Sequence, residues 1–306
     1  MDTKEVRPPF PGYRRGTGRL LVGLAEDIIE SKAFQKYRGQ VQLILTSPPF
    51  PLNRRKRYGN LQGDEYRDWL AAFAPMFRDL LTPDGSIVLE VGNAWEPKRP
   101  IMSTLTVESL LAFLKAGELN LCQQFVCNNP ARLPSPVQWV NIERIRVKDS
   151  FTHIWWMAPT DDPRANNRNV LTEYSPRMRT LLRKGSYNSG RRPSEHVIGE
   201  NSFLIDNGGA IPSNVLAHSN TISSDSYREY CLDRGLPIHP ARMPEGVSEF
   251  FIKFLTSPGD LVLDPFAGSN TTGAVANALK RRWLSIEANS DYAMGSLGRF
   301  VADGAR

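Results

Sequence analysis

A serine, two prolines and a phenylalanine stand together at the point where an apolar run of the sequence ends. They are Ser47, Pro48, Pro49 and Phe50. The residues just before them, 41–45, are mostly aliphatic, which is typical of a buried strand in a parallel sheet. Because proline fixes φ and cannot donate to a sheet ladder, we expect the chain to leave this strand in a preset loop.

The groups on this loop suit one kind of ligand. The loop holds a hydroxyl, backbone carbonyls freed from strand pairing and one aromatic face in fixed relative positions. The oxygen atoms can accept the N–H bonds of an exocyclic amino group, and the ring can stack on a flat heterocycle. A proline turn followed by a buried Phe50 is the alternative interpretation of the same residues.

A second group of candidate binding residues follows another apolar run, residues 261–263. The group consists of Asp264, Pro265, Phe266, Gly268, Ser269, Asn270 and Thr271. A strand, a loop of small residues and a helix N-terminus form a cofactor cradle at the carboxyl end of a sheet. The loop is neither G-x-G-x-x-G nor a phosphate-binding loop with its lysine. Glu287 ends the next apolar run, where an acid can bind both hydroxyls of a ribose.

Cations gather at two places in the sequence. Four of them follow the proline loop directly: Arg54, Arg55, Lys56 and Arg57. Next to Tyr58 they would suit a phosphate backbone, although a solvated loop explains the same run. Two further candidates for DNA contact, Arg191 and Arg192, lie in a polar stretch. The whole chain has 38 Lys and Arg against 32 Asp and Glu, a net charge of +6, which is a modest bias toward polyanions.

Strand and helix patterns alternate along most of the chain. We predict strands at 20–24, 41–45, 86–91, 119–127, 151–157, 261–263 and 283–287, and helices at 26–37, 65–81, 104–116, 247–255 and 274–279. This alternation predicts an α/β fold with a doubly wound sheet. Residues 1–18 are rich in Pro, Gly and Arg and are expected to form an irregular arm.

The middle of the chain has a different composition. From residue 159 to residue 238, Pro, Asn, Ser, Gly and Arg dominate and apolar periodicity fades. A stretch of this length is too long for one loop in a compact domain. We therefore expect either a small, loop-rich module or a disordered insert at 159–238, between α/β halves at 1–158 and 239–306. Polar side chains in the middle region would suit the reading of base edges.

Composition excludes several classes of protein. Cys122, Cys127 and Cys231 have neither the spacing of a metal site nor that of a disulfide framework. No apolar run reaches membrane length, and the first residues lack the apolar core of a secretory signal. A cytoplasmic protein without a metal is expected.

The conjunction of these motifs resembles a known family. The segments that carry the resemblance are 46–60, 133–141, 144–149, the pair Trp155 and Trp156, 206–212, 239–244 and 268–273. Together and in this order they resemble the S-adenosylmethionine-dependent amino methyltransferases that modify DNA, in their beta-type permutation. The similarity is closest to the PvuII-type cytosine-N4 methyltransferases and extends over most of the chain. It implies a Rossmann-like, circularly permuted sheet of the class I methyltransferase type with a target recognition insert.

The resemblance implies a role for each candidate residue. Ser47 and the Pro48 carbonyl would accept the hydrogens of the target amino group, and Phe50 would stack on a cytosine extruded from duplex DNA. The loop from Asp264 to Thr271 would bind the methionine and sugar of S-adenosyl-L-methionine. Glu287 would bind the ribose. His239 matches the segment that flanks the methionine, although a structural histidine before a helix is the alternative.

One departure from the family pattern concerns the cofactor. The family usually has Gly-Asp on its N-terminal strand, where the acid approaches the adenine, and this chain has Gly23 and Leu24. Glu26 or Asp27 would be the substitutes. Two alternatives to the cytosine-N4 activity stay open: an adenine-N6 methyltransferase and a catalytically inactive DNA-binding relative. A cytosine-C5 enzyme would need a cysteine after a proline, which the sequence does not contain.

The resemblance also implies partners. The expected substrate is double-stranded DNA with a short specific site, for which a CAGCTG-like palindrome is the first candidate. A monomer can modify each strand of a palindrome in turn, so a monomer is expected and a dimer stays open. The expected setting is a bacterial restriction–modification system, whose endonuclease shares the site without needing to bind this chain.

Overall fold

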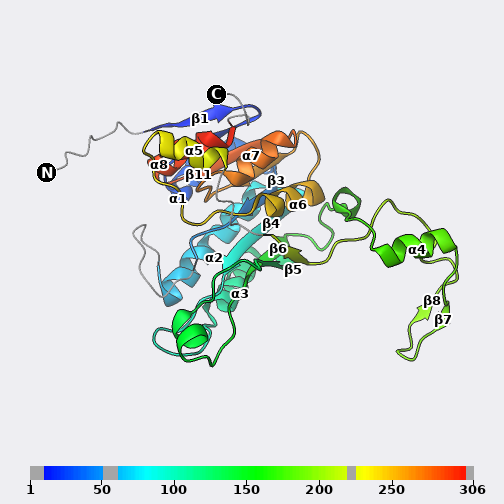
Figure 1. Cartoon of the computed structure of the whole chain (residues 1–306). Helices are drawn as coiled ribbons and strands as arrows, with labels where there is room; N and C mark the ends of the chain where they lie inside the picture. The colour runs from blue at the N-terminus through cyan, green and yellow to red at the C-terminus, as the bar shows by residue number, and fades with distance from the viewer. Residues whose placement is uncertain (1–9, 51–60, 219–224, 301–306) are drawn as a thin grey trace. The chain divides into compact units, whose positions relative to one another are not determined.

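The computed structural model describes residues 10–50, 61–218 and 225–300. The chain divides into two compact units. The larger takes its residues from Met1–Ala165 and Asn214–Arg306, and the smaller is Asn166–Ser213. Figure 1 shows the elements of both units along the chain.

A mostly parallel sheet organises the larger unit. In their order across the sheet its strands are β1 (Gly12–Arg15), β2 (Gly18–Val22), β11 (Arg282–Glu287), β10 (Leu261–Asp264), β3 (Val41–Thr46), β4 (Leu81–Gly92), β6 (Phe151–Ala158), β5 (Asn120–Asn128) and β9 (Val215–Ala217). The strands from β2 to β4 in this order are parallel to one another. Their carboxyl ends therefore share one edge, where an α/β sheet binds its ligands. The expected α/β fold with a permuted strand order is confirmed.

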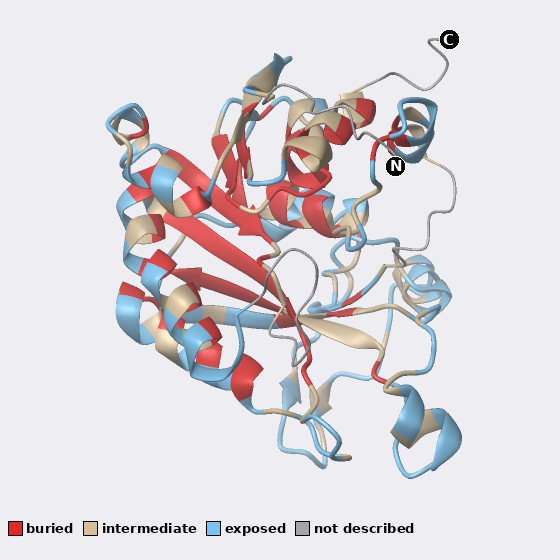
Figure 2. Ribbon diagram, turned by 90° about the vertical axis from the view of Figure 1, so that its left-hand side faces the viewer, coloured by how far each residue is buried: buried red, intermediate tan, exposed pale blue. Residues whose placement is uncertain are grey.

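Helices cover both faces of the sheet, because its central strands are apolar on both sides. Val262 and Leu263 are consecutive and fully buried, yet they belong to different hydrophobic clusters. One cluster packs under α1 (Ala25–Glu30), α2 (Gly63–Leu80) and α3 (Leu105–Gly117), and the other under α6 (Glu245–Leu255) and α7 (Thr271–Ala278). In Figure 2 the central strands are buried along most of their length. Two covered faces explain why these strands read as continuous apolar runs.

Four predicted elements differ from the structure. The strand predicted at 86–91 begins at Leu81, and the helix predicted at 274–279 begins at Thr271. Within the described part of the expected irregular arm, β1 pairs antiparallel with β2. The predicted helix at 26–37 is wrong in extent, since α1 ends at Glu30 and a short 3₁₀ turn, η1 (Gln35–Tyr37), follows. Ser31 is extended, and its backbone N–H and hydroxyl both donate to the Ile28 carbonyl, which ends the helix.

The smaller unit lies inside the polar middle region. It contains η3 (Asn167–Val170), α4 (Pro176–Lys184) and a hairpin of β7 (Gly190–Arg191) and β8 (Val197–Ile198). Helix α4 begins where Ser175 accepts the Met178 N–H, and it ends at Gly185 with φ 66°. Residues 214–238, with α5 (Ser226–Asp233), belong to the larger unit. In the described ranges no helix has the length and apolarity needed to cross a membrane.

Candidate functional site

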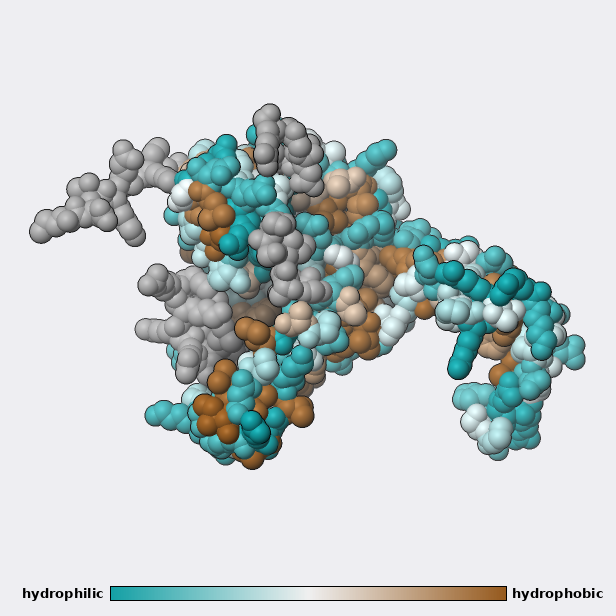
Figure 3. All heavy atoms as spheres, viewed as in Figure 1, coloured by the Kyte–Doolittle hydropathy of each residue, from teal (hydrophilic) through white to brown (hydrophobic). Residues whose placement is uncertain are grey.

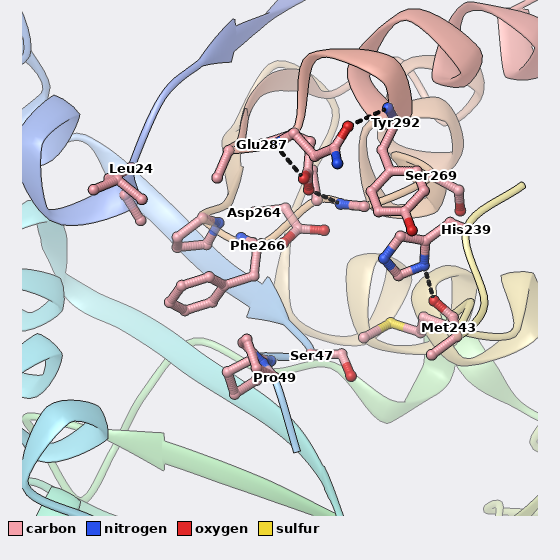
Figure 4. Close-up of a pocket in the computed structure, with 18 of the residues that line it drawn as sticks. Leu24, Ser47, Pro49, His239, Met243, Asp264, Phe266, Ser269, Glu287 and Tyr292 are labelled. Atoms are coloured by element: carbon pink, nitrogen blue, oxygen red, sulfur yellow. Dashed lines mark hydrogen bonds between the residues drawn. The ribbon is translucent and has the colours of Figure 1, made fainter. Parts of the chain in front are cut away.

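A cavity of about 510 Å³ lies at the carboxyl ends of β2, β3, β10 and β11. It brings together loops from the first and last parts of the chain, as Figure 4 shows. The predicted site residues that line it are Ser47, Pro48, Pro49, Phe50, His239, Asp264, Pro265, Phe266, Gly268, Ser269, Thr271 and Glu287. The two groups of candidate residues therefore share one site.

Ser47 lies next to a buried carboxyl group that the sequence reasoning missed. Glu90 on β4 is 6% exposed, and the neighbouring Ser47 side chain lowers its pKa. The Thr152 hydroxyl donates to Glu90 Oε1, at 2.9 Å. Burial raises the pKa of Glu90, while the two hydroxyl groups and the charge of Arg132 act in the opposite direction.

The buried Glu90 beside Ser47 affects what the serine oxygen can offer to a ligand. A serine hydroxyl has one hydrogen, and a neighbouring carboxylate is an acceptor for it. With this hydrogen directed toward Glu90, the oxygen can only accept hydrogen bonds from a group in the cavity. An exocyclic amino group is a donor of the required kind.

Close packing fixes the orientation of the proline loop. A Cβ atom at Gly92, the last residue of β4, would lie 2.5 Å from a ring carbon of Phe50. Any side chain at this position would therefore displace the Phe50 ring. The sheet positions the aromatic face as well as the hydroxyl of the loop.

Asp264 connects the two loops that form the cavity. Its Oδ1 accepts the Thr46 hydroxyl at 2.6 Å and the Phe266 N–H at 3.1 Å. The side chain is 4% exposed, and burial raises its pKa to about 6 although both bonds lower it. Asp264 thus joins the end of β3 to the loop after β10, and a wall of the cavity depends on it.

Glu287 holds the glycine loop from the neighbouring strand. Its Oε2 accepts the Gly268 N–H at 2.7 Å and its Oε1 accepts the Asn289 N–H at 2.8 Å. Burial raises the pKa of Glu287, while the same hydrogen bonds lower it. Each carboxylate oxygen has a second lone pair, so the group can still accept hydrogen bonds from a ligand in the cavity.

The glycine loop and His239 pack closely against each other. Gly268 has φ +52°, a conformation that favours glycine, and a Cβ there would lie 3.0 Å from the His239 ring. The His239 ring in turn packs edge-on against Tyr292 at 4.7 Å between ring centroids. Its Nδ1 is hydrogen-bonded to the Ala241 carbonyl. These contacts place the imidazole in the cavity wall.

Two further residues of the cofactor loop have structural partners. Ser269 contacts Arg299, whose guanidinium donates to the Ser269 carbonyl and hydroxyl, each at 3.2 Å. Asn270 is fully buried but does not line the cavity. Its Oδ1 accepts the Ser285 hydroxyl at 2.6 Å and its Nδ2 donates to Tyr13 at 2.9 Å, so it fastens the loop to the sheet.

One end of the cavity is apolar. Leu24, which is 52% exposed, lines the cavity, as do Trp69 and Phe266, whose rings are 5.5 Å apart. Glu26, in the first turn of α1, also lines the cavity, whereas Asp27 does not. Of the two substitutes considered for the missing acid, the structure brings only Glu26 to the site.

The predicted DNA contacts belong to the smaller unit or lie outside the described residues. Arg54, Arg55, Lys56 and Arg57 lie outside the described residues. Arg191 and Arg192 belong to the hairpin of the smaller unit, where they bond to Glu195 and to the Asn188 carbonyl. Their role in DNA binding stays a prediction. In the described ranges no cluster of three or more His, Cys, Asp or Glu could hold a metal ion.

A signal for Glu90 exists in the sequence. It is the single charged residue in the apolar run at 86–91, and an unpaired charge is rarely placed in a buried strand. No comparable signal exists for Arg299 or Tyr292, which reach the site from the far end of the chain.

Comparisons with known proteins agree with this site. A family model described as DNA methylase, of the N6 and N4 methyltransferase kind, matches residues 41–296. The Type II methyltransferase M.PvuII of Proteus hauseri is 41% identical over 293 residues, covering 95% of this chain and 86% of that protein. The DNA adenine methyltransferase YhdJ of Escherichia coli (strain K12) is 51% identical, but over only 61 residues, 21% of its length.

Comparison with solved structures also matches this chain to DNA methyltransferases. The structure of the PvuII DNA methyltransferase, described as cytosine-N4-specific, has a TM-score of 0.76 and 34% identity, and the match covers 96% of this chain and 90% of that one. The complex of M1.HpyAVI with SAM has a TM-score of 0.53 and 18% identity over 92% of this chain and 98% of that one, a likeness of fold alone.

Proposed function

This chain belongs to the DNA methylase family as a site-specific, cytosine-N4-type DNA methyltransferase that uses S-adenosyl-L-methionine, and we propose that Ser47, held by Glu90, binds the target amino group. The observation that supports this role most directly is the position of Ser47 in the cavity wall beside the buried Glu90. With its hydrogen directed toward Glu90, the Ser47 hydroxyl offers its oxygen as an acceptor. The N4 amino group of cytosine has two hydrogens to donate.

The residues of the proline loop can make the target nitrogen a better nucleophile. The lone pair of an aromatic amino group is delocalised into the ring, which makes the nitrogen a poor nucleophile. Acceptors at Ser47 and at the Pro48 carbonyl draw both N–H bonds out of the ring plane and return electron density to the nitrogen. Phe50, fixed against Gly92, supplies a face on which the extruded cytosine stacks. Positioning and electrostatics then supply most of the catalysis.

Residues around the glycine loop fit S-adenosyl-L-methionine. Glu287 has acceptor capacity left for two ribose hydroxyls, and the absence of a side chain at Gly268 keeps space between the loop and His239. Asp264, Ser269 and Thr271 line the same cavity as Glu287 and Ser47. When bound there, the cofactor supplies an activated methyl group on a positively charged sulfur. Buried carboxylates near this charge favour its binding.

The same residues can remove the proton that the transfer releases. Formation of the new N–C bond leaves a positive charge on the amino nitrogen, which must lose one hydrogen. The Ser47 oxygen accepts that proton as its own hydrogen passes to Glu90. Burial raises the pKa of Glu90, so its carboxylate is a better proton acceptor than an exposed one.

The DNA site and the cellular setting follow from the family. We propose a short palindrome, with CAGCTG as the first candidate, recognised through the polar region at 159–238 and the cations at 54–57. A monomer suffices for this reaction, and the bacterial cytoplasm is the expected location. An endonuclease of the same restriction–modification system would share the site without forming a complex.

The test is transfer of labelled methyl from S-adenosylmethionine to unmethylated plasmid DNA, followed by nucleoside analysis. We expect N4-methylcytosine. N6-methyladenine would refute the target base while leaving the cofactor site intact. Binding of duplex DNA without any transfer would refute catalysis and favour an inactive DNA-binding relative.

A further inference from the structure

Two apolar side chains protrude from the segment that joins β5 to β6, residues 129–150. Val147 is 87% exposed and Leu133 is 81% exposed, the highest values for large hydrophobic side chains within the described ranges. We call this pair the apolar ridge. Figure 3 shows apolar residues gathered at the lower end of the larger unit, near the short green helix of Figure 1, the π-helix η2 (Gln138–Ile142). Val137, Ile142 and Ile145 of the same segment are exposed as well, and exposed apolar side chains that gather in one patch indicate a surface that is covered in a complex.

Leu133 lies on the first limb of the segment, which follows β5, and Val147 lies on the second limb, which leads into β6. Hydrogen bonds join the two limbs. Lys148 Nζ donates to the carbonyls of Pro130 and Arg132 at 2.9 and 3.5 Å. The Asp149 N–H donates to the Ser135 carbonyl at 3.0 Å. On the first limb the acceptors lie on both sides of Leu133, and on the second limb both donors directly follow Val147. The backbone beneath the ridge is therefore braced.

The base of this segment is attached to the catalytic corner. Asn93 Nδ2 donates to Asp149 Oδ1 at 2.8 Å, and Asn93 directly follows Gly92, the residue on which Phe50 packs. On the other limb, Arg132 donates to the Phe151 carbonyl at 3.3 Å, and its charge acts on Glu90, the neighbour of Ser47. The ridge thus rises from the same edge of the sheet as the target-base loop.

Charge on the segment indicates which partner covers the ridge. Its cations are Arg132, Arg144, Arg146 and Lys148, and its acids are Glu143 and Asp149. Asp149 is buried against Asn93, and Glu143 accepts a hydrogen bond from Gln138 at 2.9 Å. The exposed charge around the ridge is therefore mainly positive, which fits the phosphates of duplex DNA.

We propose that Leu133 and Val147 enter the base stack of duplex DNA at the position that the target cytosine vacates. This inference rests on the proposed function, because it explains how the duplex stays open while Ser47 holds the base. Extrusion of a base leaves an apolar gap between its neighbours, and DNA-bending proteins stabilise opened steps with inserted aliphatic side chains. Insertion into the base stack also removes the apolar surface of the ridge from water, which is favourable.

The test compares a paired target with one that is already open. The ridge variant is Leu133→Ala with Val147→Ala. The control is Val107→Ala with Leu111→Ala, which removes the same side-chain types from α3, where they are 51% and 61% exposed. Methyl transfer is measured on two duplexes built around the cytosine that the wild-type enzyme modifies in plasmid DNA. One has guanine opposite that cytosine and the other has an abasic position.

For the ridge variant we expect kcat/KM to fall about tenfold or more on the paired duplex, because it must open the step without the inserted side chains. On the abasic duplex we expect a loss below about threefold, since little opening remains to be stabilised. The control should match the wild type on both. When the wild-type enzyme binds, the fluorescence of 2-aminopurine placed beside the target should increase. With the ridge variant this increase should be smaller, and with the control variant it should equal that of the wild type.

Three outcomes would overturn the inference. Unchanged transfer to the paired duplex would show that the ridge is not used, and equal losses on both duplexes would show a general defect. A wild-type dimer that the ridge variant alone converts to a monomer, by light scattering, would show that a second copy covers the ridge. Absence of transfer by the wild type would instead refute the proposed function itself.

Discussion

Replacement of Glu90 by glutamine tests the part of the mechanism that depends most on tertiary structure. The change keeps the size of the side chain and removes its charge. A glutamine amide can donate to the Ser47 oxygen as well as accept from its hydroxyl, so the hydroxyl is no longer forced to point away from the cavity. The Ser47 oxygen then loses its fixed polarity as an acceptor for the amino group.

The expected magnitude follows from this single contact. A hydrogen bond to a charged group contributes about 1.5–3 kcal/mol, and about 1.4 kcal/mol in the activation free energy is a tenfold change in rate. Glu90→Gln should therefore lower kcat by roughly tenfold to somewhat over a hundredfold. Loss of the proton acceptor acts in the same direction. The affinity for S-adenosylmethionine should change little, because Glu90 does not line the cavity.

The pH dependence separates this role from a purely structural one. Because burial raises the pKa of Glu90, the wild-type kcat should fall on the acid side at a higher pH than an ordinary carboxyl group would cause. The glutamine variant should lack this fall of kcat on the acid side, which we call the acid limb of the pH profile. Thr152→Val removes a bond to Glu90 but leaves Ser47 in place, so it should move the limb to higher pH with a smaller loss of rate.

The assay is single-turnover methyl transfer to duplex DNA over a pH series that starts at the ordinary pKa of a glutamate, about 4, and extends to about pH 8. Calorimetric titration with S-adenosylmethionine and thermal unfolding serve as controls for the fold. A Glu90→Gln enzyme with wild-type kcat, or one with lower kcat but an unchanged acid limb, would refute the reasoning.

Three further predictions concern other groups of the site. Ser47→Ala should lower kcat about a hundredfold while duplex affinity stays within about twofold, and a parallel loss of binding would contradict the assigned role. The Asp264 pKa is raised from its ordinary value to about 6, so the folded state binds the extra proton and stability falls as pH rises through the window from about 4 to about 6. Asp264→Asn should remove roughly 3 kcal/mol of this pH dependence in chemical denaturation, and an unchanged slope would contradict the burial argument. Glu287→Gln should weaken S-adenosylmethionine binding about tenfold or more in calorimetry, against unchanged duplex binding.

Local chemistry made much of the fold predictable. The apolar runs at 41–45 and 261–263 are buried strands, and the helices predicted at 65–81 and 247–255 appear as α2 and α6 within two residues of their predicted ends. The elements that differ depend on contacts from afar. Strand β1 forms because residues 12–15 find β2 beside them, and no periodicity of their own indicates it.

The site, like the fold, was predictable from the sequence only in part. The sequence by itself determined the residue types that could bind an amino group and a cofactor, since proline, serine and a loop of small residues have local chemistry. Only the tertiary structure decided that Thr46 and Asp264, 218 residues apart, share a hydrogen bond and that the buried Glu90 lies next to Ser47. Such pairs depend on which strands lie side by side, and strand order is set by packing and pairing over the whole sheet. Side-chain periodicity reports the face that a residue occupies, whereas its neighbour comes from another part of the chain.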